Sequence, residues 1–385
     1  CRDLLSSRGE VSGMSLAKLV LDRYAHFDDD QKVALFTLLS NEMDVSCDDA
    51  VAALKIYSDS PTAAHYAALT QFVEPARLRL IRRLNQTQDA TAQLVAMRRD
   101  LLRFIGDHPD LKKLDIDFKN LFTTWFNRGF LVLRPINWGS PAHILEKIIA
   151  YEAVHAIESW DDLRRRLEPT DRRCFAFFHP LVPEDPLIFV EVALTKEIPT
   201  SIQNIIKMDR DEINSDEINT AVFYSISNCQ DGLSGISFGN FLIKKVAHKL
   251  KQEIQGLNTF VTLSPVPGLM KWMENNAPLV YENCLNKVQD DENLIKKTIN
   301  YLTESNREDL LPNDPVARFH LGNGAILHKI NLNADMSVKG IEQSHGIMIN
   351  YLYDLNIVEK NHEQFFKDKE VIQSSEIKAL KKKYI

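Results

Sequence analysis

Hydrophobic residues in the first third of the chain recur at helical spacing, three or four positions apart. In residues 14–25 the apolar side chains near helical spacing include Leu16 and Leu19, then Leu21 and Tyr24, each pair three positions apart, and such spacing predicts a helix. Asp29 can cap the next helix, because a short acidic side chain accepts hydrogen bonds from free first-turn N–H groups. Pro75 is expected to begin a new helix, since proline suits a first turn and breaks an interior. Further helices are predicted at 48–58, 62–84, 89–107 and 116–126.

The pattern changes near Gly129, beyond which short apolar runs alternate with helical segments. Short apolar runs that are bounded by turn residues are typical of buried strands. A strong helix is predicted at 239–255, whereas 284–314 is polar and indicates a peripheral helix and loop. Strands that alternate with helices predict an α/β domain, so we expect a helical bundle over 1–128 and an α/β domain over 129–385. The predicted strands are 174–179, 187–194, 220–227, 259–264 and 325–332.

Composition and charge narrow the class of protein. The 385 residues are typical of two domains, and the formal net charge of -7 argues against a general nucleic-acid binder, which shows a basic field. The five cysteines form no CxxC pair, which indicates a reducing compartment and no zinc site. No apolar run approaches about 18 residues, so no membrane span is expected. We expect a cytoplasmic location. A mitochondrial location stays open, because the chain begins with Cys1 and not with Met, so a targeting segment cannot be judged from it.

A glycine-rich turn follows the predicted strand at 220–227 and leads into the helix at 239–255. Glycine lets backbone N–H groups approach an anion closely, and a helix N-terminus adds free N–H groups and the positive end of its dipole. A pyrophosphate fits such a place, although a turn without any ligand explains the same pattern. The candidate anion-binding residues are Ser234, Gly235, Ile236, Ser237, Phe238, Gly239 and Asn240.

Ser264 stands at the end of a predicted strand, within the run Thr-Leu-Ser-Pro-Val-Pro-Gly. Pro265 favours an extended backbone at Ser264, and the following Pro267 and Gly268 force a sharp exit from the strand. A serine in this position can point into a cleft. The alternative is that Ser264 caps a helix beginning near Pro267, since serine is a common N-cap. The segment alone leaves both interpretations open.

His320 precedes a Gly-Asn-Gly turn and a predicted strand. An imidazole has an ordinary pKa near neutrality, which suits a catalytic acid or base. Most of the eleven histidines are nevertheless expected at the surface or in the core, and this segment by itself does not decide between the two.

Taken together, these segments resemble the malonyl-CoA decarboxylase family. The resemblance runs from about Leu4 to the end of the chain, and the order and spacing of the segments agree throughout. Long matches of this kind are hard to obtain by chance. The matching stretches are 178–180, 191–194, 223–227, the glycine turn into 241–244, 263–268, 319–321, 323–325 and 350–353.

The resemblance implies an N-terminal helical domain that assembles a homo-oligomer, a dimer or a tetramer. It also implies a C-terminal catalytic domain with a GNAT-like acyl-CoA-binding fold and a mixed central sheet. The implied catalytic residues are Ser264, His320 and Tyr353, and the implied CoA-binding turn is 234–240. The implied reaction converts malonyl-CoA into acetyl-CoA and CO2 in fatty acid metabolism, with no metal, no organic cofactor, no nucleic acid and no membrane involved.

This chemistry suits the residues, because the malonyl thioester is its own electron sink and CO2 loss leaves an enolate. We expect His320 to donate a proton and Ser264 to be its hydrogen-bonding partner. Two departures from animal members of the family are a serine at Ser237, where they have glutamate, and a shorter segment between Ser264 and His320. The alternatives are a GNAT-type acyltransferase and a non-catalytic acyl-CoA-binding protein. Acetyl-CoA formed without an acceptor would distinguish a decarboxylase from the transferase, whereas substituting Ser264 or His320 would leave the function of a non-catalytic protein intact.

Overall fold

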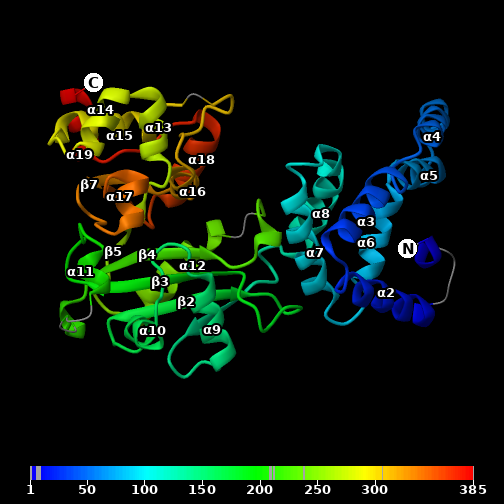
Figure 1. Cartoon of the computed structure of the whole chain (residues 1–385), viewed down its shortest axis with the longest axis horizontal. Coiled ribbons are helices and arrows are strands. Elements are labelled where there is room, and N and C mark those ends of the chain that lie inside the picture. Colours follow the sequence, from blue (N-terminus) through cyan, green and yellow to red (C-terminus); the bar gives the residue numbers. More distant parts are fainter. Residues whose placement is uncertain are drawn as a thin grey trace. The chain divides into compact units, whose positions relative to one another are not determined.

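The computed structural model of the chain divides into two compact units (Figure 1). The first, called the helical unit, combines Cys1–Val132 with two short later segments, Phe178–Asp185 and Gln230–Ser237. The second, called the sheet unit, holds the remaining residues. The domain boundary expected after residue 128 stays a prediction. The residues that the structure describes are 2–5, 10–207, 210, 213–236, 239–305 and 307–384.

Local capping signals set the beginnings of helices in the helical unit. Before α3 the Asp28 carboxylate accepts from the Gln31 N–H, and the Gln31 side chain accepts from the Asp28 N–H, which is a capping box. The predicted cap at Asp29 is therefore wrong by one residue, because Asp29 already lies in the first helical turn. The helix predicted to begin at Pro75 does so, with Pro75 as its N-cap. These helices are α1 (Arg2–Leu5), α2 (Glu10–Tyr24), α3 (Asp29–Asn41), α4 (Cys47–Asp59), α5 (Ala63–Val73), α6 (Ala76–Leu84), α7 (Ala90–Phe104) and α8 (Lys112–Trp125), with a 3-10 turn at Pro109–Leu111.

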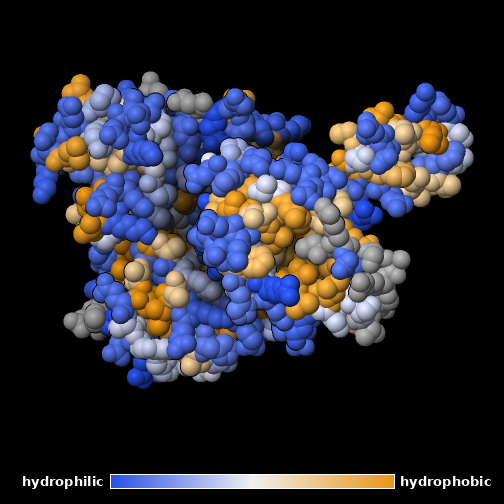
Figure 2. Space-filling model, turned by 45° about the vertical axis from the view of Figure 1, so that its right-hand side comes forward, coloured by the Kyte–Doolittle hydropathy of each residue, from blue (hydrophilic) through white to orange (hydrophobic). Residues whose placement is uncertain are grey.

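Helices α4 and α5 carry apolar side chains on their surface. Val51, Leu54 and Tyr66 are 66%, 55% and 56% exposed. Ala53 is the buried residue of α4, and the described part of α5 buries none. Figure 2 shows hydrophobic residues at the surface of this pair of helices, at its upper right. Exposed apolar side chains that gather on one surface make it a candidate interaction surface.

The sheet unit is built on an eight-stranded mixed sheet, in the order β1-β2-β3-β4-β5-β8-β6 with β7 also paired to β8 (Figure 1). The pair β4–β5 is parallel, whereas the β2–β3, β3–β4, β5–β8, β6–β8 and β7–β8 pairs are antiparallel. The predicted helical region followed by a mixed-sheet domain is confirmed. The strands are β1 (Val132–Ile136), β2 (Arg172–Phe178), β3 (Ile188–Thr195), β4 (Thr220–Asn228), β5 (Thr259–Thr262), β6 (Ser264–Pro265), β7 (Ile326–Asn331) and β8 (Met348–Leu352).

The parallel strands β4 and β5 separate after Thr262, two residues before Ser264. Their register runs from Thr220 opposite Thr259 to Phe223 opposite Thr262. Strand β4 then continues to Asn228, while the chain after β5 enters β6 and pairs with β8. Ser264 and Pro265 therefore pair with β8 and not with β4.

Helices pack against the sheet through both apolar and charged contacts. Leu242 and Val246 of α12 are fully buried, and the Lys245 ammonium lies 5.6 Å from the centre of the Phe177 ring. Arg166 of α10 reaches the buried Glu191 of β3 at 3.2 Å. No helix among the described residues has the length and hydropathy needed to cross a bilayer. The helices of this unit are α9 (Ala142–Tyr151), α10 (Trp160–Leu167), α11 (Gln203–Ile206), α12 (Gly239–Glu253), α13 (Leu269–Asn276), α14 (Pro278–Leu285), α15 (Asp291–Thr303), α16 (Pro315–Gly322), α17 (Val338–Ser344), α18 (Val358–Asp368) and α19 (Ser375–Tyr384), with a 3-10 turn at Ser215–Glu217.

Candidate active site

Ser264 lies in the short strand β6, opposite Ile349 of β8, and is 5% exposed. The prolines that follow keep the backbone extended, and helix α13 begins only at Leu269. The N-cap of that helix is Gly268, which makes no side-chain cap. The interpretation of Ser264 as a helix cap is therefore wrong, and its hydroxyl is available for other partners.

His320 lies in the last turn of α16, a helix whose first turn is capped by the buried Asp314 carboxylate, 2.7 Å from the Ala317 N–H. The helix ends in a turn at Gly324, where φ is +85°. A Cβ atom there would lie 1.9 Å from the carbonyl oxygen of Val358. Both observations require glycine, and the tight turn fixes the end of α16 that presents His320.

The three predicted catalytic residues form one hydrogen-bonded chain in the sheet unit. Ser264 Oγ lies 3.0 Å from His320 Nε2, and His320 Nδ1 lies 2.8 Å from the hydroxyl of Tyr353. The Ser264 hydroxyl donates to Thr262 Oγ1 at 2.8 Å. Because its only proton is used there, Ser264 Oγ accepts from His320 Nε2–H, and Nδ1 accepts from Tyr353.

Strand β8 holds the imidazole in this orientation. The Tyr351 ring stacks on the His320 ring at a centroid distance of 4.7 Å and an angle of 24°. The Tyr351 N–H also donates to Thr262 Oγ1 at 3.2 Å. Just beyond the strand, the Tyr353 N–H donates to the Phe260 carbonyl at 2.8 Å. The backbone thus fixes both tyrosines relative to the histidine.

Burial dominates the electrostatics of the site. Desolvation lowers the pKa of His320 from 6.5 to about 3, since a buried imidazolium loses its hydration. The imidazole is therefore neutral at pH 7. Its pKa lies well below the near-neutral value expected from the sequence, because that value applies to a hydrated histidine. Burial also raises the pKa values of Tyr351 and Tyr353 well above 10, so both phenols keep their protons.

Several buried polar atoms beside this chain make no hydrogen bond with described residues. They are the Tyr351 hydroxyl, both terminal atoms of the Asn323 amide and Asp314 Oδ1. Beside the larger effect of burial, the Asn323 side chain lowers the pKa of Tyr353 and the Asp314 charge raises the pKa of Tyr351. Burial raises the pKa of Asp314 to about 6. Buried polar groups without partners are rare in folded proteins, so these atoms are candidates to contact a substrate.

Thr262, Tyr351 and Asn323 were not predicted as site residues. Thr262 has the sequence signal of an ordinary strand residue, and Tyr351 that of an ordinary core aromatic. Asn323 belongs to the Gly-Asn-Gly turn after His320, which could have indicated a functional amide. The other two become visible only when β5, β8 and α16 are brought together.

The predicted CoA-binding turn is described only in part. Ser234, Gly235 and Ile236 belong to the helical unit, and Gly239 and Asn240 begin α12 of the sheet unit. Ser237 and Phe238 lie outside the described residues. The CoA-binding role of this turn therefore stays a prediction.

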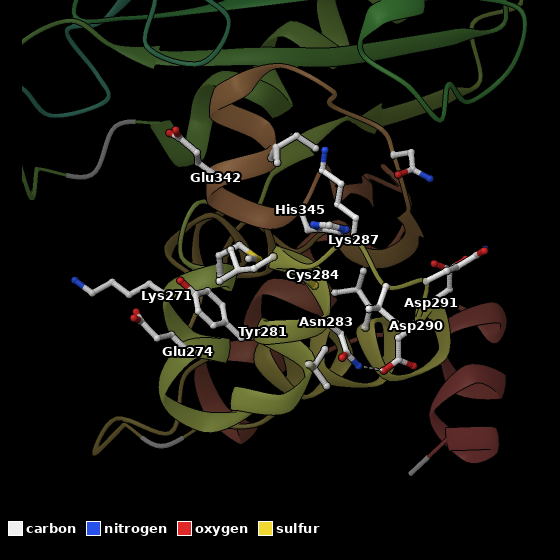
Figure 3. A pocket seen from close by; sticks show the side chains of 18 of the residues that line it. Lys271, Glu274, Tyr281, Asn283, Cys284, Lys287, Asp290, Asp291, Glu342 and His345 are labelled. Atoms are coloured by element: carbon white, nitrogen blue, oxygen red, sulfur yellow. Dashed lines mark hydrogen bonds between the residues drawn. The ribbon is translucent and has the colours of Figure 1, made fainter.

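A pocket of about 950 Å³ lies in the sheet unit among α13, α14, α15 and α17. In Figure 3 its wall carries both charges, with Lys271 and Glu274 on one side and Asp290 bonded to Asn283. Ser264, His320 and Tyr353 are not among its lining residues, so it is a separate feature. Within the described residues, no three His, Cys, Asp or Glu side chains are grouped to hold a metal ion.

Comparison with known families places the chain. Residues 129–384 match the model of the malonyl-CoA decarboxylase C-terminal domain, and residues 45–126 match that of the N-terminal domain. The chain belongs to the malonyl-CoA decarboxylase family. The resemblance noted from the sequence segments is thereby confirmed, and the family is one of decarboxylases, which are carboxy-lyases.

Individual relatives agree with this assignment. The mitochondrial malonyl-CoA decarboxylase of Anser anser anser is 33% identical over 352 residues, covering 80% of this chain and 69% of the relative. The crystal structure of malonyl-CoA decarboxylase from Agrobacterium vitis is 47% identical with a TM-score of 0.93, covering 99% of this chain and 98% of that one. The corresponding structure from Rhodopseudomonas palustris is 44% identical with a TM-score of 0.92, covering 99% and 97%. These decarboxylases therefore share both units with the present chain.

Proposed function

We propose that this chain decarboxylates malonyl-CoA to acetyl-CoA and CO2, with Ser264, His320 and Tyr353 at the reacting group. The observation that carries the proposal is the buried chain of hydrogen bonds from Thr262 through Ser264 and His320 to Tyr353. Membership of the malonyl-CoA decarboxylase family supports the choice of substrate.

The reaction needs a binding site for the carboxylate, donors for an enolate and a source of one proton. The bond between the carboxylate carbon and the methylene carbon breaks, and its electron pair moves into the thioester to form an enolate. The methylene carbon then takes up a proton to give the acetyl group. Since the thioester itself accepts the electrons, this step requires no metal or organic cofactor.

His320 supplies the proton in this proposal. It is neutral in the unliganded site because burial lowers its pKa to about 3. An incoming malonyl carboxylate is an opposite charge, which favours the imidazolium, so we expect substrate binding to take up a proton. The Ser264 hydroxyl then turns its proton from Thr262 Oγ1 to the enolate carbon and takes the Nε2 proton of the imidazolium, 3.0 Å away, which returns His320 to its neutral form.

Ser264 acts as a hydrogen-bonding relay in this arrangement. Its hydroxyl proton points to Thr262 Oγ1, and its oxygen accepts from His320. A nucleophilic serine would instead give its proton to an adjacent base. The network therefore favours direct decarboxylation over a covalent acyl-serine.

Asn323 and Tyr351 are suited to stabilise the enolate. Both have buried donor groups without a hydrogen-bond partner among the described residues. A donor that is aimed at a developing oxyanion in a buried site is typically worth about 3–4 kcal/mol in the transition state. We assign the thioester oxygen to these donors.

We assign binding of the CoA pyrophosphate to the turn at residues 234–240. The described residue Gly235 has φ +75°, a conformation that glycine adopts readily. Helix α12 begins at Gly239, and a helix N-terminus favours phosphate groups. Gly235→Val should therefore weaken CoA binding in calorimetry while Gly13→Val, in α2 with nothing near its Cβ position, serves as a folded control.

We also infer that the helical unit assembles a homo-oligomer through α4 and α5, whose apolar side chains are exposed. The double variant Val51→Glu and Leu54→Glu would place charges in such an interface. Sedimentation velocity should then show a smaller species than for the unsubstituted chain. An unchanged sedimentation coefficient would rule out this surface. A cytoplasmic location stays an expectation.

The decisive test is turnover of malonyl-CoA by the purified chain, followed by mass spectrometry. We expect acetyl-CoA to accumulate without an acceptor, and His320→Ala and Ser264→Ala to lower kcat about 100-fold or more. Melting curves control for folding, and His26→Ala is a matched substitution of an exposed histidine. A transferase would leave malonyl-CoA unchanged until an acceptor is added, and a near-normal kcat in His320→Ala would remove this residue from the mechanism.

A further inference from the structure

Arg98 of α7 is a buried arginine that grips the chain just before Gly235. It is 2% exposed, and its Nη1 donates to the carbonyl oxygens of Gly232 at 2.8 Å and Ser234 at 2.9 Å. Its Nε donates to Asp115 of α8 at 2.8 Å. All of these residues belong to the helical unit. A buried charge with this many partners holds the turn in one geometry.

The contact also fixes the direction of a free backbone donor. The peptide between Ser234 and Gly235 is planar and trans, so its N–H points opposite to its C=O. Because Arg98 holds the Ser234 carbonyl, the Gly235 N–H is directed away from Arg98. Among the described residues it donates to no backbone acceptor, which leaves it available to an anion.

Lys119 of α8 places a cation beside the same turn. A Cβ atom built on Gly235 would lie 3.3 Å from Lys119 Nζ, and Lys119 is exposed. No described carboxylate forms an ion pair with it, whereas Lys113 of the same helix pairs with Asp44 at 2.8 Å. An outward N–H and an unpaired ammonium at one glycine are the elements of a phosphate site.

We propose that the helical unit binds the phosphates of CoA, with Lys119 as the cationic contact and Arg98 as the positioning residue for the Gly235 N–H. This inference rests on the proposed function and extends it, because residues far from the glycine turn in sequence then contribute to substrate recognition. The ligand chemistry is a phosphate or pyrophosphate group, and its source is the nucleotide part of CoA.

Lys119→Ala tests the cationic contact. We expect KM for malonyl-CoA to rise about tenfold or more, since hydrogen bonds to charged groups are worth that factor, with kcat within about twofold. The effect should vanish with malonyl-pantetheine, which lacks the phosphates. Lys113→Ala removes a cation from the same helix and should leave both KM values unchanged.

Arg98 requires a pair of variants, because the loss of a buried charge can unfold the chain. Arg98→Met removes every donor, whereas Arg98→Lys keeps a cation that can reach one carbonyl. We expect Arg98→Met to raise KM for malonyl-CoA more than KM for malonyl-pantetheine, and Arg98→Lys to recover part of the difference. A purely structural arginine would change both substrates equally.

The outcomes separate this inference from the proposed function. Equal effects of Lys119→Ala on both substrates, or no effect on either, would overturn the phosphate site. If the unsubstituted chain does not decarboxylate malonyl-CoA, the proposed function fails, and calorimetry with CoA alone still decides the site. Weaker CoA binding by Lys119→Ala but not by Lys113→Ala would then support it, and equal binding by both would refute it.

Discussion

Acid should destabilise this protein through His320. Burial lowers the pKa of His320 from 6.5 to about 3, so the unfolded chain takes up this proton more readily than the folded chain. The contribution to stability is fully present above pH 6.5 and is lost as the pH falls towards 3. The full difference is about 3.5 pKa units, or about 5 kcal/mol at 1.36 kcal/mol per unit.

The loss is already measurable at moderate pH. A pH of 5.0 lies about 1.5 units below the pKa of the imidazole in the unfolded chain. This difference corresponds to a loss of about 2 kcal/mol in the free energy of unfolding. His320→Gln removes the titration but keeps a polar side chain. We therefore expect the free energy of unfolding to fall by about 2 kcal/mol less in His320→Gln than in the unsubstituted chain between pH 7.5 and 5.0.

Neighbouring groups do not change the sign of this comparison. The His320 ring stacks on Tyr351 and meets Tyr353 edge-on, and the raised pKa values of both phenols keep them neutral throughout this range. Asp314, which acts on Tyr351, has a pKa raised to about 6, so it gains stability as the pH falls. Its contribution is common to both proteins and cancels in the difference between them.

The assay is urea unfolding followed by tryptophan fluorescence at pH 7.5 and 5.0, with equal slopes required for comparison. His26→Gln, at an exposed position, is the matched control and should follow the unsubstituted chain. The reasoning would be refuted if His320→Gln lost as much stability on acidification as the unsubstituted chain. In that case the imidazole is hydrated or protonated in the folded state.

Three further substitutions test the geometry around the site. Gly324→Ala should lower stability by at least about 2 kcal/mol in thermal melting, because φ is +85° and Val358 O would lie 1.9 Å from the new atom; Gly106→Ala, with nothing within 4 Å, should not. Thr262→Val leaves the Ser264 hydroxyl without its acceptor, and kcat should fall about tenfold with KM little changed. Tyr353→Phe removes the partner of His320 Nδ1, and steady-state kinetics should show a lower kcat in a folded protein.

Local patterns predicted most of the elements, because helical spacing and apolar runs depend on a few neighbouring residues. The predicted strand at 220–227 corresponds to β4, Thr220–Asn228, and the helix at 239–255 to α12, Gly239–Glu253. Strand β8, Met348–Leu352, was not predicted. It is a short run of five residues, and its role depends on pairing with the nearby β7 and with β5 and β6, of which the last two lie far away in sequence.

The site shows the same limit. Ser264 and His320 were identified because proline and glycine mark their segments and because the whole pattern resembles one family. Whether Ser264 caps a helix could not be decided locally, since the observed cap at Gly268 depends on where α13 begins. The low pKa of His320 likewise follows from burial by several elements, and no segment alone carries that information.

The grip of Arg98 on Gly232 and Ser234 has a consequence for dissecting the protein. An expression fragment that starts at residue 129 would lack α7, and two carbonyl groups would lose a buried ionic donor. It would also expose the surface of Gly232, where a Cβ atom would overlap Val95 O at 2.0 Å. Such a fragment should be cleaved by proteases near residues 230–236, even where the sheet remains folded. The sequence-contiguous halves are therefore poor units for separate expression or for exchange between homologues.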